Sequence, residues 1–239
     1  MAKRKWAELA AAVSPMPACS LESISLFGRL YILPNLATVV DLSCVRSLEI
    51  QVIEDSGVLE QAASVLNNPE RLFLTVWQVA QNRDLRRIYD RVVTAIRTFH
   101  PLKHISLCGL SSITDLKRII EVHGRTLQCL VLTPELVTGH IYNGEMVDYR
   151  YPELTNSEIA HLNQACPNLQ ELRLPFRRSA GSPRECNMYR ALGQFRNLHT
   201  LILDLQFNSK FQLDRPIYLS ETRTSFINAA TDEKLALDI

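Results

Sequence analysis

The clearest hydrophobic pattern in the chain is Leu169-Gln-Glu-Leu-Arg-Leu174, in which leucine occupies the first, fourth and sixth positions. This spacing is too short for an amphipathic helix of any length. It is typical of a bend followed by a short strand, with Leu172 and Leu174 on one face and Glu171 and Arg173 on the other. The hexamer therefore predicts a strand with one apolar face and one polar face.

The same spacing of apolar residues occurs seven times along the chain. The seven segments are Leu21–Leu26, Val45–Ile50, Pro69–Leu74, Leu102–Leu107, Leu127–Leu132, Leu169–Leu174 and Leu198–Leu203. Their first residues are separated by 24, 24, 33, 25, 42 and 29 positions. Recurrence at about 20–50 residues is typical of stacked-repeat proteins, and this spacing matches the leucine-rich type, with one strand and one helix per repeat.

The intervals between these segments predict helices. Residues 84–99 carry apolar side chains at steps of three and four, and Pro101 prevents the helix from continuing. Ser112 predicts the N-cap of a second helix, which turns His123 inward together with its leucine and isoleucines and stops at Gly124.

Three further helices are expected. Thr155-Asn-Ser-Glu158 fits a capping box at the start of a helix that ends before Cys166-Pro167. Residues 55–66 predict a shorter helix, and the apolar stretch 30–42 predicts one that starts at Pro34. Such connections are long enough to join parallel strands.

Three segments depart from the repeat. Residues 134–154 contain three tyrosines without an apolar period and are expected to form an ordered insertion loop. Residues 176–186 are expected to form a basic, solvated turn, with a phosphate or acidic-partner site as the less favoured alternative. Residues 221–239 predict a final helix whose inward side chains are Phe226, Ile227, Ala230, Leu235 and Ile239, which leaves the repeat array open at its C-terminal end.

These patterns together predict an α/β fold. We expect a leucine-rich-repeat-like right-handed solenoid with short parallel strands inside and helices outside, formed by residues 21–239 after an N-terminal extension at 1–20. In this fold one residue from each strand lines up along a common sheet. The expected column is Leu48, Leu72, Ile105, Leu130, Leu172 and Leu201.

The strand residues that alternate with this column are candidates for binding a protein partner, because a solenoid presents its inner sheet face as a concave surface. Phe73 is the expected anchor, since an exposed aromatic among polar neighbours is typical of binding hot spots. The alternative is a solvated sheet face with Phe73 tucked against a neighbour. The predicted partner-binding residues are Ser47, Glu49, Gln51, Arg71, Phe73, Thr75, His104, Ser106, Glu171, Arg173, Thr200 and Asp204.

Composition narrows the classes of partner. The net charge of +1 gives no overall field toward nucleic acid or anionic lipid, so we expect neither as a partner. The sequence contains no run of about 18 apolar residues, so no membrane span is predicted. The six cysteines form no CxxC pair, and several lie within apolar segments, which favours reduced, buried thiols and a cytoplasmic or nuclear protein.

No catalytic, cofactor-binding or metal-binding residues are predicted. The six histidines lack metal-ligand spacing, because Pro101 interrupts any helix that would bring His100 and His104 onto one face. No phosphate-binding glycine motif and no nucleophile elbow occurs. An enzyme remains the less favoured alternative, with a site in the insertion near Tyr142, Asp148 and Tyr151.

The repeats also resemble a known family. Cys166-Pro-Asn-Leu-Gln-Glu-Leu-Arg-Leu174 and Phe195-Arg-Asn-Leu-His-Thr-Leu-Ile-Leu203 are similar to the cysteine-containing leucine-rich repeats of F-box proteins. Leu26-Phe-Gly-Arg-Leu30 leading to Val45-Arg-Ser-Leu-Glu-Ile50, and Phe226–Ala236, resemble segments of fungal F-box/leucine-rich-repeat proteins.

This resemblance implies a non-catalytic role in which the repeats recognise the substrate of a cullin-type ubiquitin ligase. The F-box, which docks such proteins onto the ligase adaptor, begins with an apolar-proline-x-glutamate pattern that this sequence does not contain. The adaptor is therefore an expected partner only if an F-box lies outside this chain. The alternative is a stand-alone leucine-rich-repeat scaffold.

Overall fold

Strands and helices alternate along the part of the chain that the structure, a computed structural model, describes: residues 21–27, 33–37, 40–51, 57–76, 85–110, 112–133, 154–177 and 182–206. The strands are β1 (Ser23–Phe27), β2 (Ser47–Gln51), β3 (Arg71–Thr75), β4 (His104–Cys108), β5 (Cys129–Thr133), β6 (Glu171–Arg177) and β7 (Thr200–Gln206). The helices are α2 (Leu33–Leu36), α3 (Gly57–Val65), α4 (Leu85–Thr98), α5 (Ile113–His123), α6 (Asn156–Ala165) and α7 (Pro183–Leu192).

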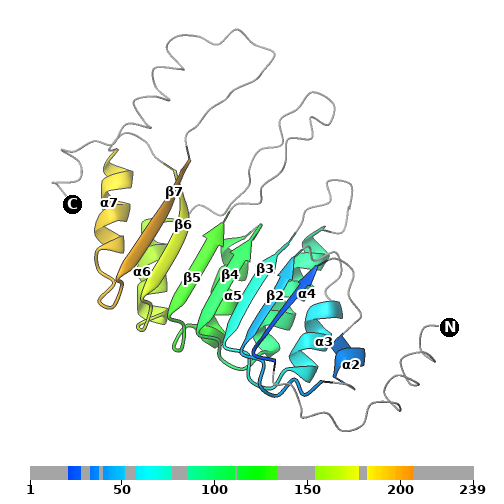
Figure 1. The fold of residues 1–239 in the computed structure, drawn as a ribbon. Coiled ribbons are helices and arrows are strands. Elements are labelled where there is room, and N and C mark those ends of the chain that lie inside the picture. The colour runs from blue at the N-terminus through cyan, green and yellow to red at the C-terminus, as the bar shows by residue number, and fades with distance from the viewer. Residues whose placement is uncertain are drawn as a thin grey trace, which may run out of the picture.

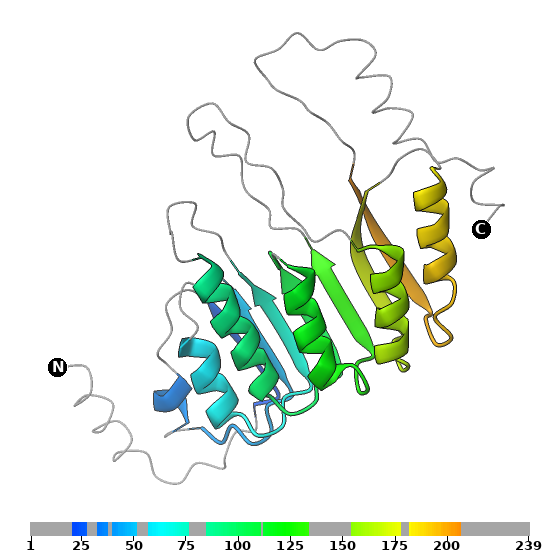
Figure 2. The ribbon, with the colours of Figure 1, turned by 180° about the vertical axis from the view of Figure 1, so that it is seen from behind.

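All seven strands form one parallel sheet in the order of the sequence, from β1 to β7. The helices lie together on one face of this sheet, and no described element covers the other face (Figures 1 and 2). Each of the seven predicted segments supplies one strand. The prediction of an α/β fold with short parallel strands and helices on one side is confirmed.

The expected column of apolar residues is present. In the strand register Ile24 pairs with Leu48, Leu48 with Leu72, and the series continues to Leu201. The five inner members, Leu48, Leu72, Ile105, Leu130 and Leu172, are at most 1% exposed. Because side chains alternate between the faces of a strand, this register puts every column residue on the helix side of the sheet.

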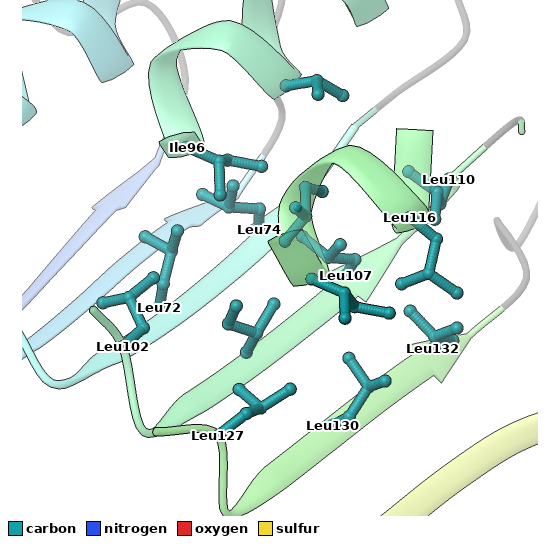
Figure 3. Close-up of a cluster of buried hydrophobic side chains, with 14 of the residues drawn as sticks. Leu72, Leu74, Ile96, Leu102, Leu107, Leu110, Leu116, Leu127, Leu130 and Leu132 are labelled. Atoms are coloured by element: carbon teal, nitrogen blue, oxygen red, sulfur yellow. The ribbon is translucent and has the colours of Figure 1, made fainter. Parts of the chain in front are cut away.

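The helices and the bends before the strands complete the core. Figure 3 shows leucines of β3, β4 and β5 packed together with Ile96 of α4 and Leu116 of α5. Leu102 and Leu127, the first leucines of their repeats, are fully buried at the bends that precede β4 and β5. The first position of the repeated pattern therefore anchors the bend, and the next two anchor the strand.

Each helix-to-strand turn is fixed by main-chain hydrogen bonds. The carbonyl before one strand accepts two bonds from the next turn; for example, the Glu70 carbonyl accepts the N–H groups of Lys103 and His104 at 2.9 and 3.0 Å. The same pair of bonds recurs at every neighbouring strand start in the sheet. Four of these turns, 66–70, 99–103, 124–128 and 166–170, have the same length of five residues. The strand-to-helix connections are more variable, from four residues at 109–112 to 22 at 134–155.

The predicted helix caps form as expected. The Ser112 hydroxyl accepts a hydrogen bond from the Thr114 N–H at 3.1 Å. Thr155 and Glu158 make the reciprocal bonds of a capping box, which satisfy two N–H groups that a helix start otherwise leaves unpaired.

The prediction of a turn over residues 176–186 is wrong at both of its ends. Strand β6 continues through Arg177, and α7 begins at Pro183. Ser182 caps this helix through a bond from the Glu185 N–H, and proline is favoured in the first helical turn because it has no N–H to leave unpaired. The arginines around this segment obscured the sequence signal for the start of α7.

Gly124 ends α5 at the predicted position but for a different physical reason. Its φ of −53° and ψ of −41° are right-handed, so no left-handed cap is formed. Instead, a Cβ at this position would lie 2.6 Å from the Ala165 carbonyl oxygen and 2.7 Å from that of Ile120. Glycine is required here by the close approach of the chain at the end of α6.

His123 is buried as predicted, and both of its ring nitrogens have partners. Nδ1 accepts the Leu102 N–H at 3.1 Å, and Nε2 lies 3.1 Å from the Ile96 carbonyl oxygen, so the neutral ring with its proton on Nε2 satisfies both bonds. Burial lowers the pKa of His123, and the bond to the Ile96 carbonyl opposes that shift. The ring ties the end of α4 to the bend before β4.

Several predicted segments lie outside the described residues. They are the extension at 1–20, the insertion at 134–153, residues 178–181 of the basic turn, and the final helix at 221–239.

Gly124→Ala is expected to lower the free energy of unfolding by about 1–3 kcal/mol, since overpacking against backbone cannot be relieved by a side-chain rotation. Gly193→Ala is the matched control, because Gly193 also follows a helix with right-handed dihedrals but its Cβ would meet its nearest atoms at an ordinary 3.6 Å. That control is expected to leave stability unchanged or raise it by about 0.4–1 kcal/mol. Urea denaturation measures both; equal effects would contradict the close-approach argument.

Acid is expected to destabilise the fold through His123. A folded-state pKa below the ordinary 6.5 means that stability is complete above about pH 6.5 and falls as the pH drops below it, by at most about 1.4 kcal/mol per pH unit. Thermal denaturation between pH 5 and 8 measures this slope. His123→Gln should flatten it, whereas His104→Gln should leave most of it, because His104 is only partly buried.

Candidate protein-binding surface

The sheet face opposite the helices, here called the open face, consists of the strand residues that alternate with the buried column. Its members in β2, β3 and β4 are intermediate or exposed, between buried neighbours on the same strands. All twelve residues predicted from the sequence lie on this face, on five strands that share one register. The structure thus brings together residues from positions 47 to 204.

The register sorts the open face into rows that run across the strands. The first row is Ser23, Ser47, Arg71, His104, Cys129, Glu171 and Thr200. The middle row is Ser25, Glu49, Phe73, Ser106, Val131, Arg173 and Ile202. In the middle row, from Phe73 onward, apolar and polar side chains alternate from strand to strand.

Three large apolar side chains are exposed on the open face. Phe73 is 40% exposed, Ile202 46% and Phe27 72%. Phe73 therefore keeps a large part of its ring in water, although more than half of its surface is covered by neighbours. The three side chains lie on β1, β3 and β7, so they are spread across the face among polar side chains.

The sequence prediction missed part of this face. It omitted all of β1 and β5, including Phe27 and Val131, and also Ile202 of β7. The signal was present: each residue follows directly after an inward-facing leucine of its own repeat, namely Leu26, Leu130 and Leu201. Applying the same alternation to every repeat would have found them.

One ion pair ties the last two strands together on this face. Arg173 donates from Nε to Asp204 Oδ2 at 2.9 Å and from Nη2 to Oδ1 at 3.0 Å, a two-bond arrangement. This hydrogen bonding to Asp204 raises the pKa of Arg173. On β2, Gln51 Nε2 donates to Glu49 Oε1 at 2.6 Å. These four polar side chains are therefore paired within the face, and ordering them in advance lowers the entropy cost of recognising a partner.

His104 and Cys129 occupy paired positions on neighbouring strands, which raises the question of a nucleophilic site. Burial raises the pKa of Cys129 to about 11, helped by a hydrogen bond with Glu171 and by its charge. Burial also lowers the pKa of His104, as does the nearby Arg71. A thiol that keeps its proton next to an uncharged imidazole lacks the thiolate that nucleophilic catalysis needs.

In the described part of the chain, no three histidine, cysteine, aspartate or glutamate side chains come together in a way that could hold a metal ion. None of the helices that the structure describes combines the length and apolar character needed to cross a membrane. The insertion residues Tyr142, Asp148 and Tyr151 lie outside the described residues.

The comparisons with known proteins add no identification. No protein-family model and no curated protein matches this sequence.

Alkylation by iodoacetamide is expected to be slow at Cys129, because a pKa of about 11 leaves roughly one thiol in a thousand ionised at pH 8. Glu171→Gln removes a charge and a hydrogen-bond acceptor that raise this pKa, so it should speed the reaction at Cys129. Mass spectrometry of the peptide containing Cys129 measures the rate. Glu49→Gln, on the same face but two strands further from Cys129 than Glu171, is the control and should leave the rate unchanged.

Proposed function

We propose that this chain is a non-catalytic protein-binding module built as a leucine-rich-repeat-like right-handed solenoid. Support for the solenoid comes from seven repeats that each supply one strand, from their sequential parallel order, and from helices that all lie on one side. Crossovers between parallel strands are right-handed in about 98% of cases, so a series of them advances the chain with one hand. Fixed helix-to-strand turns give successive repeats the same start.

The observation that carries the binding role is the open face itself. Residues from all seven strands line up on it, it is uncovered by any described element, and it exposes Phe73, Ile202 and Phe27 among polar groups. Apolar anchors surrounded by polar side chains are the composition of protein-protein interfaces. A mixed-sign surface with a net charge of +1 over the chain favours a protein partner over nucleic acid or anionic lipid.

Substrate recognition for a cullin-type ubiquitin ligase is the specific role we favour. Its support is the resemblance of the repeats around Leu169–Leu174 and Leu198–Leu203 to those of F-box proteins. In such an assembly the repeats hold the substrate, while an F-box outside this chain contacts the adaptor. In that role the open face binds the protein that is to be modified.

A stand-alone scaffold uses the same surface and differs only in what accompanies it. The third candidate, an enzyme, requires a site in the insertion at 134–154 with a carboxylate of perturbed pKa near Tyr142 and Tyr151. Nothing described on the open face favours that candidate, since Cys129 keeps its proton and no metal-holding group occurs among the described residues.

Phe73→Ala is expected to weaken binding of the substrate protein by more than about tenfold, as expected for an apolar anchor at the centre of an interface. Affinity purification of the full chain followed by quantitative mass spectrometry identifies the bound proteins, and titration with the purified partner gives the dissociation constant. Gln164→Ala is the control, because Gln164 is exposed on α6, on the opposite side of the sheet.

The same experiment separates the candidate functions. The ligase role is supported if both variants of the intact gene product recover adaptor and cullin subunits equally. It also requires that a substrate is lost only in Phe73→Ala. A partner lost in Phe73→Ala without ligase subunits supports the scaffold. Partners that bind the two variants equally well would contradict the proposed use of the open face.

A further inference from the structure

The helix side of β7 differs from that of every other strand. Leu201 belongs to the buried column but is 41% exposed, whereas its neighbour in the register, Leu172, is 1% exposed. Leu203, the next apolar residue on that side, is only partly buried, while its partner Leu174 is 2% exposed. Two apolar positions of the repeat thus lack the cover that all inner strands have.

The reason lies in the order of the elements. Each inner strand is followed in the sequence by a helix on the helix side of the sheet, as α6 follows β5 and α7 follows β6, whereas no described helix follows β7. Strand β7 is the last described element and lies at one end of the sheet (Figure 1). The opposite end is better protected, because Ile24 and Leu26 of β1 are 6% and 7% exposed.

We propose that the chain's own residues 221–239 cover the helix side of β7. This segment follows β7 in the sequence and carries apolar side chains at Phe226, Ile227 and Ala230, in the steps of one and three that a helix needs to present one apolar face. The occupant is therefore part of this chain, and Leu201 and Leu203 are the residues it buries.

The connection has a suitable length. Residues 207–220 separate β7 from this segment by 14 positions, which falls between the four residues at 109–112 and the 22 at 134–155 that join other strands to their helices. Fourteen residues reach at most about 46–50 Å. That exceeds the roughly 23 Å length of a seven-residue strand, so the segment can run back along β7.

A comparison of two neighbouring residues tests the proposal in the full chain. Leu201 and Ile202 are 41% and 46% exposed in the described residues but face opposite sides of β7. If the segment covers the helix side, Leu201→Ala should lower the urea midpoint several times more than Ile202→Ala, because buried truncations cost far more than exposed ones. Equal shifts would overturn the proposal.

A double-mutant cycle identifies the covering segment. Phe226→Ala combined with Leu201→Ala should lower the midpoint by less than the two separate shifts added together, since each substitution removes the same contact. Phe226→Ala combined with Ile202→Ala is the control and should be additive. Additive shifts in both pairs would overturn the proposal.

A second measurement uses the unsubstituted chain. A soluble spin label should broaden the NMR methyl signals of Ile202 much more than those of Leu201, and dilution should not change this difference. Similar broadening at both residues would overturn the proposal. So would protection of Leu201 that disappears on dilution together with a dimer detected by light scattering, because a second copy would then be the cover.

Discussion

The structure depends on aligning one apolar side chain of each strand with the equivalent side chains of the neighbouring strands. Parallel pairing sets this register. The aligned side chains from Leu48 to Leu172 then form a continuous buried apolar layer under the helices. A shift of one residue in any strand would move its leucines to the open face and bring polar groups into the core. Register, core and surface are therefore fixed by the same spacing.

A sheet covered on one side separates the roles of its two faces. The helix side requires leucine or isoleucine at nearly every position, because its residues are enclosed by neighbouring strands and helices. The open face has no such requirement, so serine, arginine, phenylalanine and glutamate occur there on equivalent positions of adjacent strands. Residues of this face can differ without disturbing the core, which is the property that a recognition surface needs.

Much of the fold could be predicted from the sequence because its signals are local. The leucine spacing identified all seven strands, and hydroxyl residues followed by glutamate identified helix starts such as the one at Thr155. The start of α7 at Ser182 carries the same signal, but the surrounding arginines were read as a solvated turn. The twelve predicted surface residues lie on one face because strand alternation is a fixed geometric rule.

What the sequence could not show depends on contacts between distant segments. Gly124 resembles an ordinary helix stop, and only the closeness of the Ala165 carbonyl explains why glycine is needed. Burial raises the pKa of Cys129, and Glu171, which lies 42 positions away in the sequence, raises it further. Leu201 has the same local pattern as its buried counterparts, and its exposure reflects its place at the end of the sheet.

The connections before and after the strands differ in how much variation in length they show. Where the chain enters the strands, paired bonds to single carbonyls join neighbouring strands, and four of the six connections have five residues, while those before β2 and β7 have ten and seven. Where the chain leaves the strands, connections of four to 22 residues coexist in one molecule. Lineages that carry this fold should therefore gain and lose sequence mainly where the chain leaves the strands, because the longest connection, 134–155, lies there.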